Sequence, residues 1–228
     1  FTFEPDTNQQ LLEVTVDGKS IGTPESYTYK NLTLNSRIVA TFTGAMLFLD
    51  VRREDWFYSD VRYVVEHGLF HGTTQELFSP NAPMTRGMLV TVLYRLAGSP
   101  KSAADSGFAD VAAGKYYADA VAWAAESGIV SGVSDGRFAP DSQVTREQLA
   151  AILYRYARDK RYDTGRTADL MSFADYEQIS GYAAEALGWT NAEGLVSGRS
   201  KTALSPQGSA TRAEVAAILH RFAENVAK

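Results

Sequence analysis

The sequence contains no cysteine, and histidine (3 residues) and proline (7 residues) are scarce in its 228 residues. The absence of cysteine excludes disulfide bonds, zinc–thiolate and iron–sulfur sites, and thiol nucleophiles. No apolar run approaches the ~18 residues of a membrane-spanning helix, so we expect no membrane insertion. Positive charge is also in deficit, because 22 Lys and Arg face 27 Asp and Glu, for a net charge of −5. Such a surface does not attract nucleic acid in bulk, and any anion site must therefore be local.

The usual signatures of enzymes are also missing. There is no Gly-rich phosphate loop, no Gly-x-Ser-x-Gly elbow and no His-Glu-x-x-His motif. His67 and His71 are four residues apart, but Gly68 lies between them at an expected helix end, which argues against a metal site. The neighbouring acids Glu54 and Asp55 are typical of an exposed acidic turn. We therefore predict no enzyme activity, no cofactor and no metal.

The composition is that of a folded protein, with 45% hydrophobic and 21% charged residues. Its length suits one or two domains with a substantial core. The chain opens at Phe1 without a signal peptide, so we expect a mature or trimmed fragment.

One pattern occurs three times along the chain. Asp50-Val51 recurs as Asp110-Val111, and the correspondence continues at a constant offset of 60 to Thr85-Arg86 and Thr145-Arg146. A third copy begins at Phe173-Ala-Asp175 and runs at an offset of 66 as far as Thr211-Arg212 and beyond. The copies cover about 48–98, 108–158 and 173–226, with linkers over 98–107 and 159–172. Three tandem copies indicate a repeat protein.

Each copy is predicted to form two helices joined by a loop. The first helices are expected over Phe57–His67, Tyr117–Ser127 and Ala183–Glu193, each followed by a glycine suited to a left-handed cap, Gly68, Gly128 or Gly194. The second helices are expected to open at Thr85, Thr145 and Thr211. A two-helix unit cannot bury its apolar faces alone, as shown by the stripe Leu149, Ile152, Leu153 and Tyr156. The three copies are therefore expected to pack together, giving a mainly α fold over 45–228.

Residues 1–44 show a different, strand-like pattern. Apolar residues alternate at Leu12, Val14 and Val16, at Tyr27 and Tyr29, and at Ile38, Ala40 and Phe42. Asp17-Gly18 predicts a turn after the first of these runs. We expect a short β-rich segment, which is either the end of an upstream surface domain or a piece that packs on the helices.

The repeat resembles the S-layer homology motif. The second copy carries the pattern in full as Phe108-Ala-Asp110-Val111, Tyr116, Gly128-Ile-Val-Ser-Gly132, Phe138-Ala-Pro140 and Thr145-Arg-Glu-Gln148. The copies cover about Leu49–Val226, and three is the usual number in that family. Residues 1–43 look like the tail of a bacterial immunoglobulin-like or β-grasp surface repeat, through Val14-Thr-Val-Asp-Gly18 and Tyr27-Thr-Tyr-Lys-Asn31.

The resemblance implies a three-pronged, pseudo-threefold helical domain that anchors exported proteins non-covalently to the bacterial cell wall. It implies an extracellular location and, as partner, a secondary wall polysaccharide ending in pyruvylated N-acetylmannosamine, held in grooves between repeats. The resemblance also implies that the Arg of each Thr-Arg pair meets the pyruvyl carboxylate. The unit is expected to be monomeric, with lattice or cargo contacts open to it.

The repeated Thr-Arg pair also supports an anion site without the family. Thr145-x-x-Gln148 and Thr211-x-x-Glu214 are capping boxes, which explains the threonines but not the arginines. A cation in the first turn opposes the helix dipole, whereas free N–H groups beside a guanidinium would suit a carboxylate. A salt bridge to the repeated aspartates is the competing use. The candidate polymer-binding residues are Arg86, Arg146, Arg212, Thr85, Thr145, Thr211, Asp50, Asp110, Asp175, Trp56, Tyr116, Tyr182, Gly72, Gly132 and Gly198.

Other repeated positions leave two readings open. The aromatic residues at the first-helix start, Trp56, Tyr116 and Tyr182, could stack on a sugar or fill the core, and so could Tyr63, Trp123 and Trp189 one heptad later. We expect the later glycines, Gly72, Gly132 and Gly198, to serve the backbone conformation, although a wall without side chains would also let a sugar approach. The late-helix arginines, Arg95, Arg155 and Arg221, are expected to be structural.

The copies also depart from the motif unequally. The first copy has Thr85-Arg-Gly-Met88 without an acidic residue, the second ends in Gln148, and only the third keeps Glu214. We therefore expect unequal grooves, with Arg86 the weakest contributor.

Two other functions stay open at this stage. The repeats could form a structural lattice or protein-interaction module, or they could be the anchor of a larger surface hydrolase.

Overall fold

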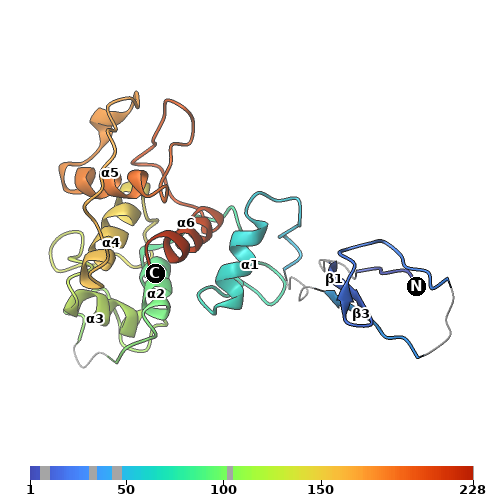
Figure 1. The fold of residues 1–228 in the computed structure, drawn as a ribbon. Coiled ribbons are helices and arrows are strands. Elements are labelled where there is room, and N and C mark those ends of the chain that lie inside the picture. The colour runs from blue at the N-terminus through green and yellow to red at the C-terminus, as the bar shows by residue number, and fades with distance from the viewer. Residues whose placement is uncertain (6–10, 31–34, 43–47, 102–104, 228) are drawn as a thin grey trace. The chain divides into compact units, whose positions relative to one another are not determined.

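The computed structural model describes residues 1–5, 11–30, 35–42, 48–101 and 105–227. They fall into two compact units, which are considered separately: 1–58 with 72–78, and 59–71 with 79–228. The described helices are α1 (Tyr58–Glu66), α2 (Arg86–Leu96), α3 (Ala118–Glu126), α4 (Arg146–Asp159), α5 (Ala184–Ala192) and α6 (Arg212–Asn225), with short 3-10 turns η1 (Tyr176–Gln178) and η2 (Gly181–Ala183) (Figure 1). The expected mainly α class is confirmed. The three-pronged arrangement stays a prediction.

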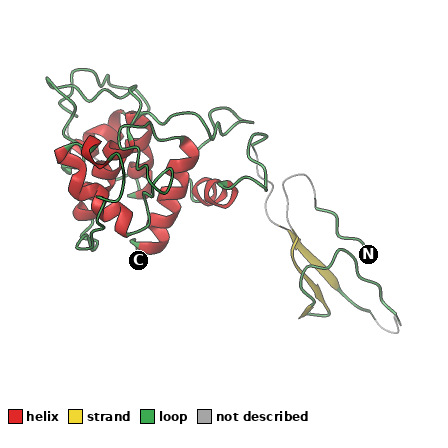
Figure 2. Cartoon of the chain, turned by 90° about the horizontal axis from the view of Figure 1, so that it is seen from above, coloured by secondary structure: helices red, strands yellow, loops and turns green. Residues whose placement is uncertain are grey.

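The first unit contains a small antiparallel sheet. Its strands, drawn in yellow in Figure 2, are β1 (Leu11–Val16), β2 (Lys19–Ser20) and β3 (Ile38–Phe42). Their order in the sheet is β2-β1-β3. Asp17 and Gly18 have φ values of 50° and 80°, which a tight hairpin turn requires, so the predicted turn is confirmed.

The strand expected around Tyr27 and Tyr29 is wrong. Both residues lie outside the strands, and the Tyr27 backbone N–H donates to the Phe1 carbonyl over 2.9 Å. Their rings instead meet edge to face, with centroids 5.0 Å apart. Alternating aromatic residues fit a loop as well as a strand when the rings pack on each other.

The repeat helices begin and end where the sequence predicts. Helices α1, α3 and α5 each lie one residue inside the predicted limits at both ends. The threonine hydroxyls of α2, α4 and α6 accept from the backbone N–H three residues on, at 3.2, 3.3 and 3.2 Å. The capping boxes of α4 and α6 are both present. The glycines after the first helices, Gly68, Gly128 and Gly194, have φ values of 67°, 68° and 68°, as the left-handed cap demands.

A closed ring of backbone hydrogen bonds joins the three repeats just before their second helices. Met84 donates to the Ala210 carbonyl (2.8 Å), Ala210 to Val144 (3.0 Å) and Val144 back to Met84 (2.9 Å). All three residues are fully buried. No single repeat can satisfy this ring, because each segment receives its hydrogen-bond partner from another copy.

The second helix of each repeat also packs on the first helix of the next. Helix α2 packs against α3, and α4 packs against α5. The cycle is closed by His220 on α6, whose Nδ1 lies 2.8 Å from Asp60 Oδ1 on α1 and whose ring stacks on Tyr63. The predicted stripe Leu149, Ile152, Leu153 and Tyr156 is at most 3% exposed, so this part of the core prediction is confirmed.

Candidate functional site

The N-terminal N–H groups of the second helices are not free. The first two residues of α2, α4 and α6 donate to carbonyls of the loop in the next repeat, over 2.8–3.0 Å. The third N–H in each helix is bound by the capping threonine. The premise that free helix-end N–H groups favour an anion is therefore wrong here, because the neighbouring repeat supplies the acceptors. The six donor–acceptor pairs are Arg86–Ser142, Gly87–Pro140, Arg146–Gly208, Glu147–Pro206, Arg212–Ala82 and Ala213–Pro80.

The repeated arginines reach across the repeat boundaries. They are only 4–6% exposed. Arg86 Nε donates to the Phe138 carbonyl at 2.8 Å, Arg146 Nε to that of Leu204 at 3.1 Å, and Arg212 Nη2 to that of His71 at 2.7 Å. Burial lowers the pKa of Arg86 and Arg146 from the usual guanidinium value. Each arginine thus fastens one copy to the next, a role that the sequence argument did not consider.

The repeated aspartates hold the loop that precedes the second helix. Asp50 accepts from the Phe78 N–H at 2.8 Å. Asp110 accepts from the N–H groups of Phe138 and Ala139, both at 2.8 Å, and Asp175 accepts from the corresponding pair in the third repeat. Burial acts to raise the pKa of Asp110, but these donors hold it below the usual value. Asp110 and Asp175 therefore order the loops whose carbonyls accept from Arg86 and Arg146.

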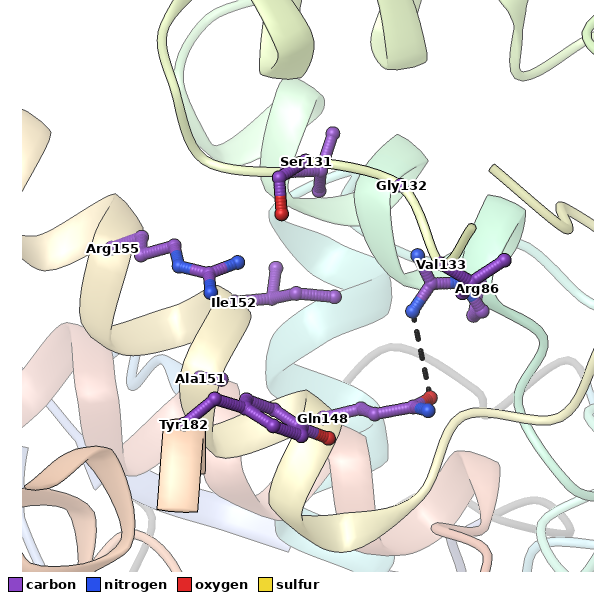
Figure 3. Close-up of a pocket in the computed structure, with 10 residues that line it drawn as sticks. Arg86, Ser131, Gly132, Val133, Gln148, Ala151, Ile152, Arg155 and Tyr182 are labelled. Atoms are coloured by element: carbon purple, nitrogen blue, oxygen red, sulfur yellow. Dashed lines mark hydrogen bonds between the residues drawn. The ribbon is translucent and has the colours of Figure 1, made fainter. Parts of the chain in front are cut away.

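A pocket of about 340 Å³ lies beside α4 (Figure 3). We call it the α4 pocket. It unites three of the predicted site residues, each from a different repeat: Arg86, Gly132 and Tyr182. The full lining is Arg86, Val130, Ser131, Gly132, Val133, Gln148, Ala151, Ile152, Arg155 and Tyr182.

The α4 pocket contains two guanidinium groups and no carboxylate among these described lining residues. Arg86 Nη1 faces the neutral side-chain oxygen of Gln148 at 3.5 Å, and Arg155 lies across the pocket from Arg86 (Figure 3). Burial is the main cause of the lowered pKa of Arg86, and the charge of Arg155 acts in the same direction. An anion entering this space would meet two positive groups, while the nearby carboxylates of Asp110 and Glu147 accept hydrogen bonds from backbone N–H groups and hydroxyls.

Arg155 is the site residue that sequence reasoning missed. Its counterparts in the other repeats, Arg95 and Arg221, are structural, as predicted. Arg95 Nη1 donates to the Leu69 carbonyl at 2.9 Å, and Arg221 Nη1 lies 3.4 Å from the carbonyl oxygens of Gly194 and Leu195. Within the described part of the chain, the Arg155 guanidinium makes no such hydrogen bond or ion pair. Helical spacing was the only available signal, because residues 148, 152 and 155 fall on one face of α4.

Tyr182 presents a fixed ring to the α4 pocket. Its hydroxyl donates to Glu147 Oε1 at 2.9 Å, while the residue as a whole is 54% exposed. Glu147 is buried and also accepts from the Ser180 hydroxyl and N–H, at 2.7 and 3.0 Å. Burial, aided by Glu147, raises the pKa of Tyr182 to about 12, so the phenol stays neutral. A tethered ring with an open face is suited to stacking on a sugar.

The other repeated aromatic residues divide into two groups. Trp56 and Tyr116, the counterparts of Tyr182, are 62% and 61% exposed. Trp123 and Trp189 are buried. Trp56 and Tyr116 therefore do not fill the core, and that alternative is wrong for them. It is correct for Trp123 and Trp189.

The repeated glycines are explained mainly by close packing. Only Gly132 has a positive φ, 81°, so backbone conformation does not account for Gly72 and Gly198. A Cβ on Gly72 would lie 2.4 Å from Phe48 Cε1, and one on Gly198 would lie 2.7 Å from Phe173 Cε1. These contacts require a residue without a side chain.

Residues 47–87, 107–150 and 172–216 match the S-layer homology domain, and together they make up more than half of the chain. The chain belongs to the S-layer homology family. The resemblance predicted from the repeats is thereby confirmed, with the same number of copies. Membership places the chain at the bacterial cell-wall surface in an anchoring role. Among the described residues, no helix has the length and apolar character needed to span a membrane.

Curated relatives carry this domain within much longer proteins. The chain is 29% identical to an amylopullulanase of Thermoanaerobacterium thermosulfurigenes, over 98% of this chain and 12% of the relative. It is 32% identical to a surface-layer 125 kDa protein of Lysinibacillus sphaericus, over 73% and 14%. It is 27% identical to a cellulosome-anchoring protein of Acetivibrio thermocellus, over 70% and 36%. The chain thus spans about a third or less of each of these relatives.

Proposed function

We propose that this S-layer homology chain anchors a bacterial surface protein by binding the acidic end of a secondary wall polysaccharide in the α4 pocket. The observation that carries the proposal is the pairing of Arg86 and Arg155 in a pocket whose lining has no carboxylate. A pyruvylated N-acetylmannosamine offers a carboxylate on a sugar ring. A guanidinium is suited to bind the carboxylate, and the open face of the Tyr182 ring is suited to stack on the sugar ring.

The geometry gives Arg86 a larger role in binding than the sequence suggested. Its Nε is held on the Phe138 carbonyl and its guanidinium carbon lies 4.7 Å from the Phe138 ring centre, so the group is oriented before a ligand arrives. Preorganisation reduces the entropy lost on binding. A charge-assisted hydrogen bond contributes about 1.5–3 kcal/mol, which is roughly ten- to more than a hundredfold in affinity. We therefore propose that Arg86, which seemed the weakest candidate, contributes most.

The anchored cargo follows from the size of the relatives. Enzymes, a surface-layer protein and a cellulosome-anchoring protein all carry a matching segment within a longer chain. We propose that the repeats hold such a cargo at the wall and take no part in its chemistry. A role purely in lattice contacts is the competing outcome.

Binding to purified wall sacculi, before and after chemical removal of the secondary polymer, tests the anchoring role. We expect binding to disappear with the polymer. Unchanged binding to stripped sacculi would refute the proposal, and binding only to other copies of the chain would favour the lattice role.

Calorimetric titration tests the pocket with a short pyruvylated wall saccharide and its depyruvylated form. We expect only the pyruvylated form to bind, and Arg155→Ala to weaken it at least tenfold, because Arg155 has no described structural bond to lose. Arg221→Ala is the matched control, since Arg221 faces its own repeat, and it should bind within a few-fold of the wild type. Equal affinity for both saccharides would contradict the assignment of the pocket.

A further inference from the structure

The position beside α6 that corresponds to the α4 pocket carries different side chains. At the offset of 66 that relates the second and third repeats, Glu214 replaces Gln148 and Arg199 replaces Val133. Arg146 stands there in the place that Arg86 holds in the α4 pocket. The two positions differ elsewhere as well, because Arg221, the counterpart of Arg155, lies near the carbonyls of Gly194 and Leu195, and Gly198 lacks the positive φ of Gly132. The effect of the third helix residue is therefore tested within the α4 pocket itself.

Beside α6, the carboxylate of Glu214 lies close to two arginines, Arg146 and Arg199. Glu214 Oε1 lies 3.8 Å from Arg146 Nη1. Arg199 Nη2 lies 3.1 Å from both Glu214 oxygens, and its Nε lies 3.3 Å from one of them. The same Arg199 nitrogen, Nη2, also donates to the Ser209 carbonyl at 2.7 Å. The extra cation is therefore engaged with Glu214 and does not add an open anion site.

We infer that the third residue of the second helix decides which repeat boundary accepts the acidic sugar. The inference rests on the proposed function and adds its specificity determinant. Beside Arg86, an incoming carboxylate meets the neutral amide of Gln148. Beside Arg146, it meets the negative charge of Glu214, whose Oε1 lies 3.8 Å from the guanidinium and which also binds Arg199. The carboxylates of Glu214 and the sugar would repel each other at this range. Glu214 also competes from within the same molecule, whereas the sugar must bind from solution.

This position can be altered in charge without loss of the helix cap. Gln148 Oε1 accepts from the Thr145 N–H at 3.4 Å, and Glu214 Oε2 accepts from the Thr211 N–H at 2.8 Å. Both residue types therefore complete a capping box in this chain. The first repeat has Met88 at the same position, and its helix is still capped by Thr85. Both Glu and Met are therefore suitable replacements for Gln148.

The test titrates the short pyruvylated saccharide into the full chain and three variants. Gln148→Glu introduces the charge pattern of α6 into the α4 pocket, and we expect affinity to fall at least tenfold. Gln148→Met removes the amide without adding charge, and affinity should fall clearly less than it does in Gln148→Glu. Glu214→Gln removes the charge beside α6 and should leave the α4 affinity unchanged. Circular dichroism melting confirms that each variant is folded.

The outcomes separate this inference from the proposed function. If the wild type does not bind the saccharide, the proposed function fails. If the wild type binds and Gln148→Glu binds equally well, the specificity inference alone is overturned. It is also overturned if Gln148→Met loses as much affinity as Gln148→Glu, because the amide and not the charge would then matter.

Discussion

Deleting the third repeat, Ser172–Lys228, should unfold the remaining two. In the described chain, six backbone hydrogen bonds join the third repeat to the other copies. At about 0.5–1.5 kcal/mol each, they contribute roughly 3–9 kcal/mol. Small domains have only about 5–15 kcal/mol of total stability. These bonds are Met84–Ala210, Ala210–Val144, Arg146–Gly208, Glu147–Pro206, Arg212–Ala82 and Ala213–Pro80.

The deletion also opens the centre of the ring. Met84 and Val144 are fully buried beside Ala210 and would become exposed. Each such side chain adds about 1.5–3 kcal/mol to the loss. Arg146 would meanwhile lose the Leu204 carbonyl that accepts from its guanidinium. Together these losses are as large as the stability of the whole domain.

Size-exclusion chromatography and thermal circular dichroism of the 1–171 fragment would measure this effect. We expect aggregation or a broad, non-cooperative melt. Adding the separate 172–228 segment should restore a cooperative transition, which shows that the loss comes from the missing ring partners. A monomeric 1–171 fragment with a sharp melt would refute the argument that the repeats complete one another.

Three further results are expected. A chain that starts near Thr43 should keep its polymer affinity within a few-fold, because the α4 pocket is lined by no residue before Thr43. A hundredfold loss of affinity in a folded protein, measured by calorimetry, would contradict this. His220→Ala should lower the free energy of unfolding in a denaturant titration by about 2–3 kcal/mol, since it loses a hydrogen bond to Asp60 and a ring stack between two repeats. His67→Ala should cost less than His220→Ala, because the contacts of His67 with the Tyr63 carbonyl and ring lie within one helix turn. Backbone N–H donors lower the pKa of Asp175 in the folded state. The contribution of Asp175 to stability is therefore present above the unfolded pKa of ~3.9 and is lost as the pH falls through the lower folded value. In thermal melts, Asp175→Asn should be less stable at pH 7 and lose less stability as the pH falls.

The sequence alone determined the local elements of this protein. Capping residues, glycines after helix ends and 3.6-residue periodicity are short-range signals, and repetition at a fixed offset confirms each of them twice. That is why the limits of α1, α3 and α5 were predicted within one residue, and why Thr145 and Thr211 were recognised as capping boxes. The strand expected at Tyr27 and Tyr29 had no such repetition behind it, and it was wrong.

The tertiary structure alone decided which side chains meet and which charges are already satisfied. Arg86, Arg155 and Tyr182 come from three repeats, and no sequence spacing shows that they line one pocket. The helix-end N–H groups that seemed open to an anion are bound by carbonyls of the next repeat. The arginines at equivalent positions differ because Glu214 lies beside Arg146, while neutral Gln148 lies beside Arg86. Hydrogen-bond partners and local charge depend on residues brought together from distant parts of the chain, and only the folded arrangement fixes them.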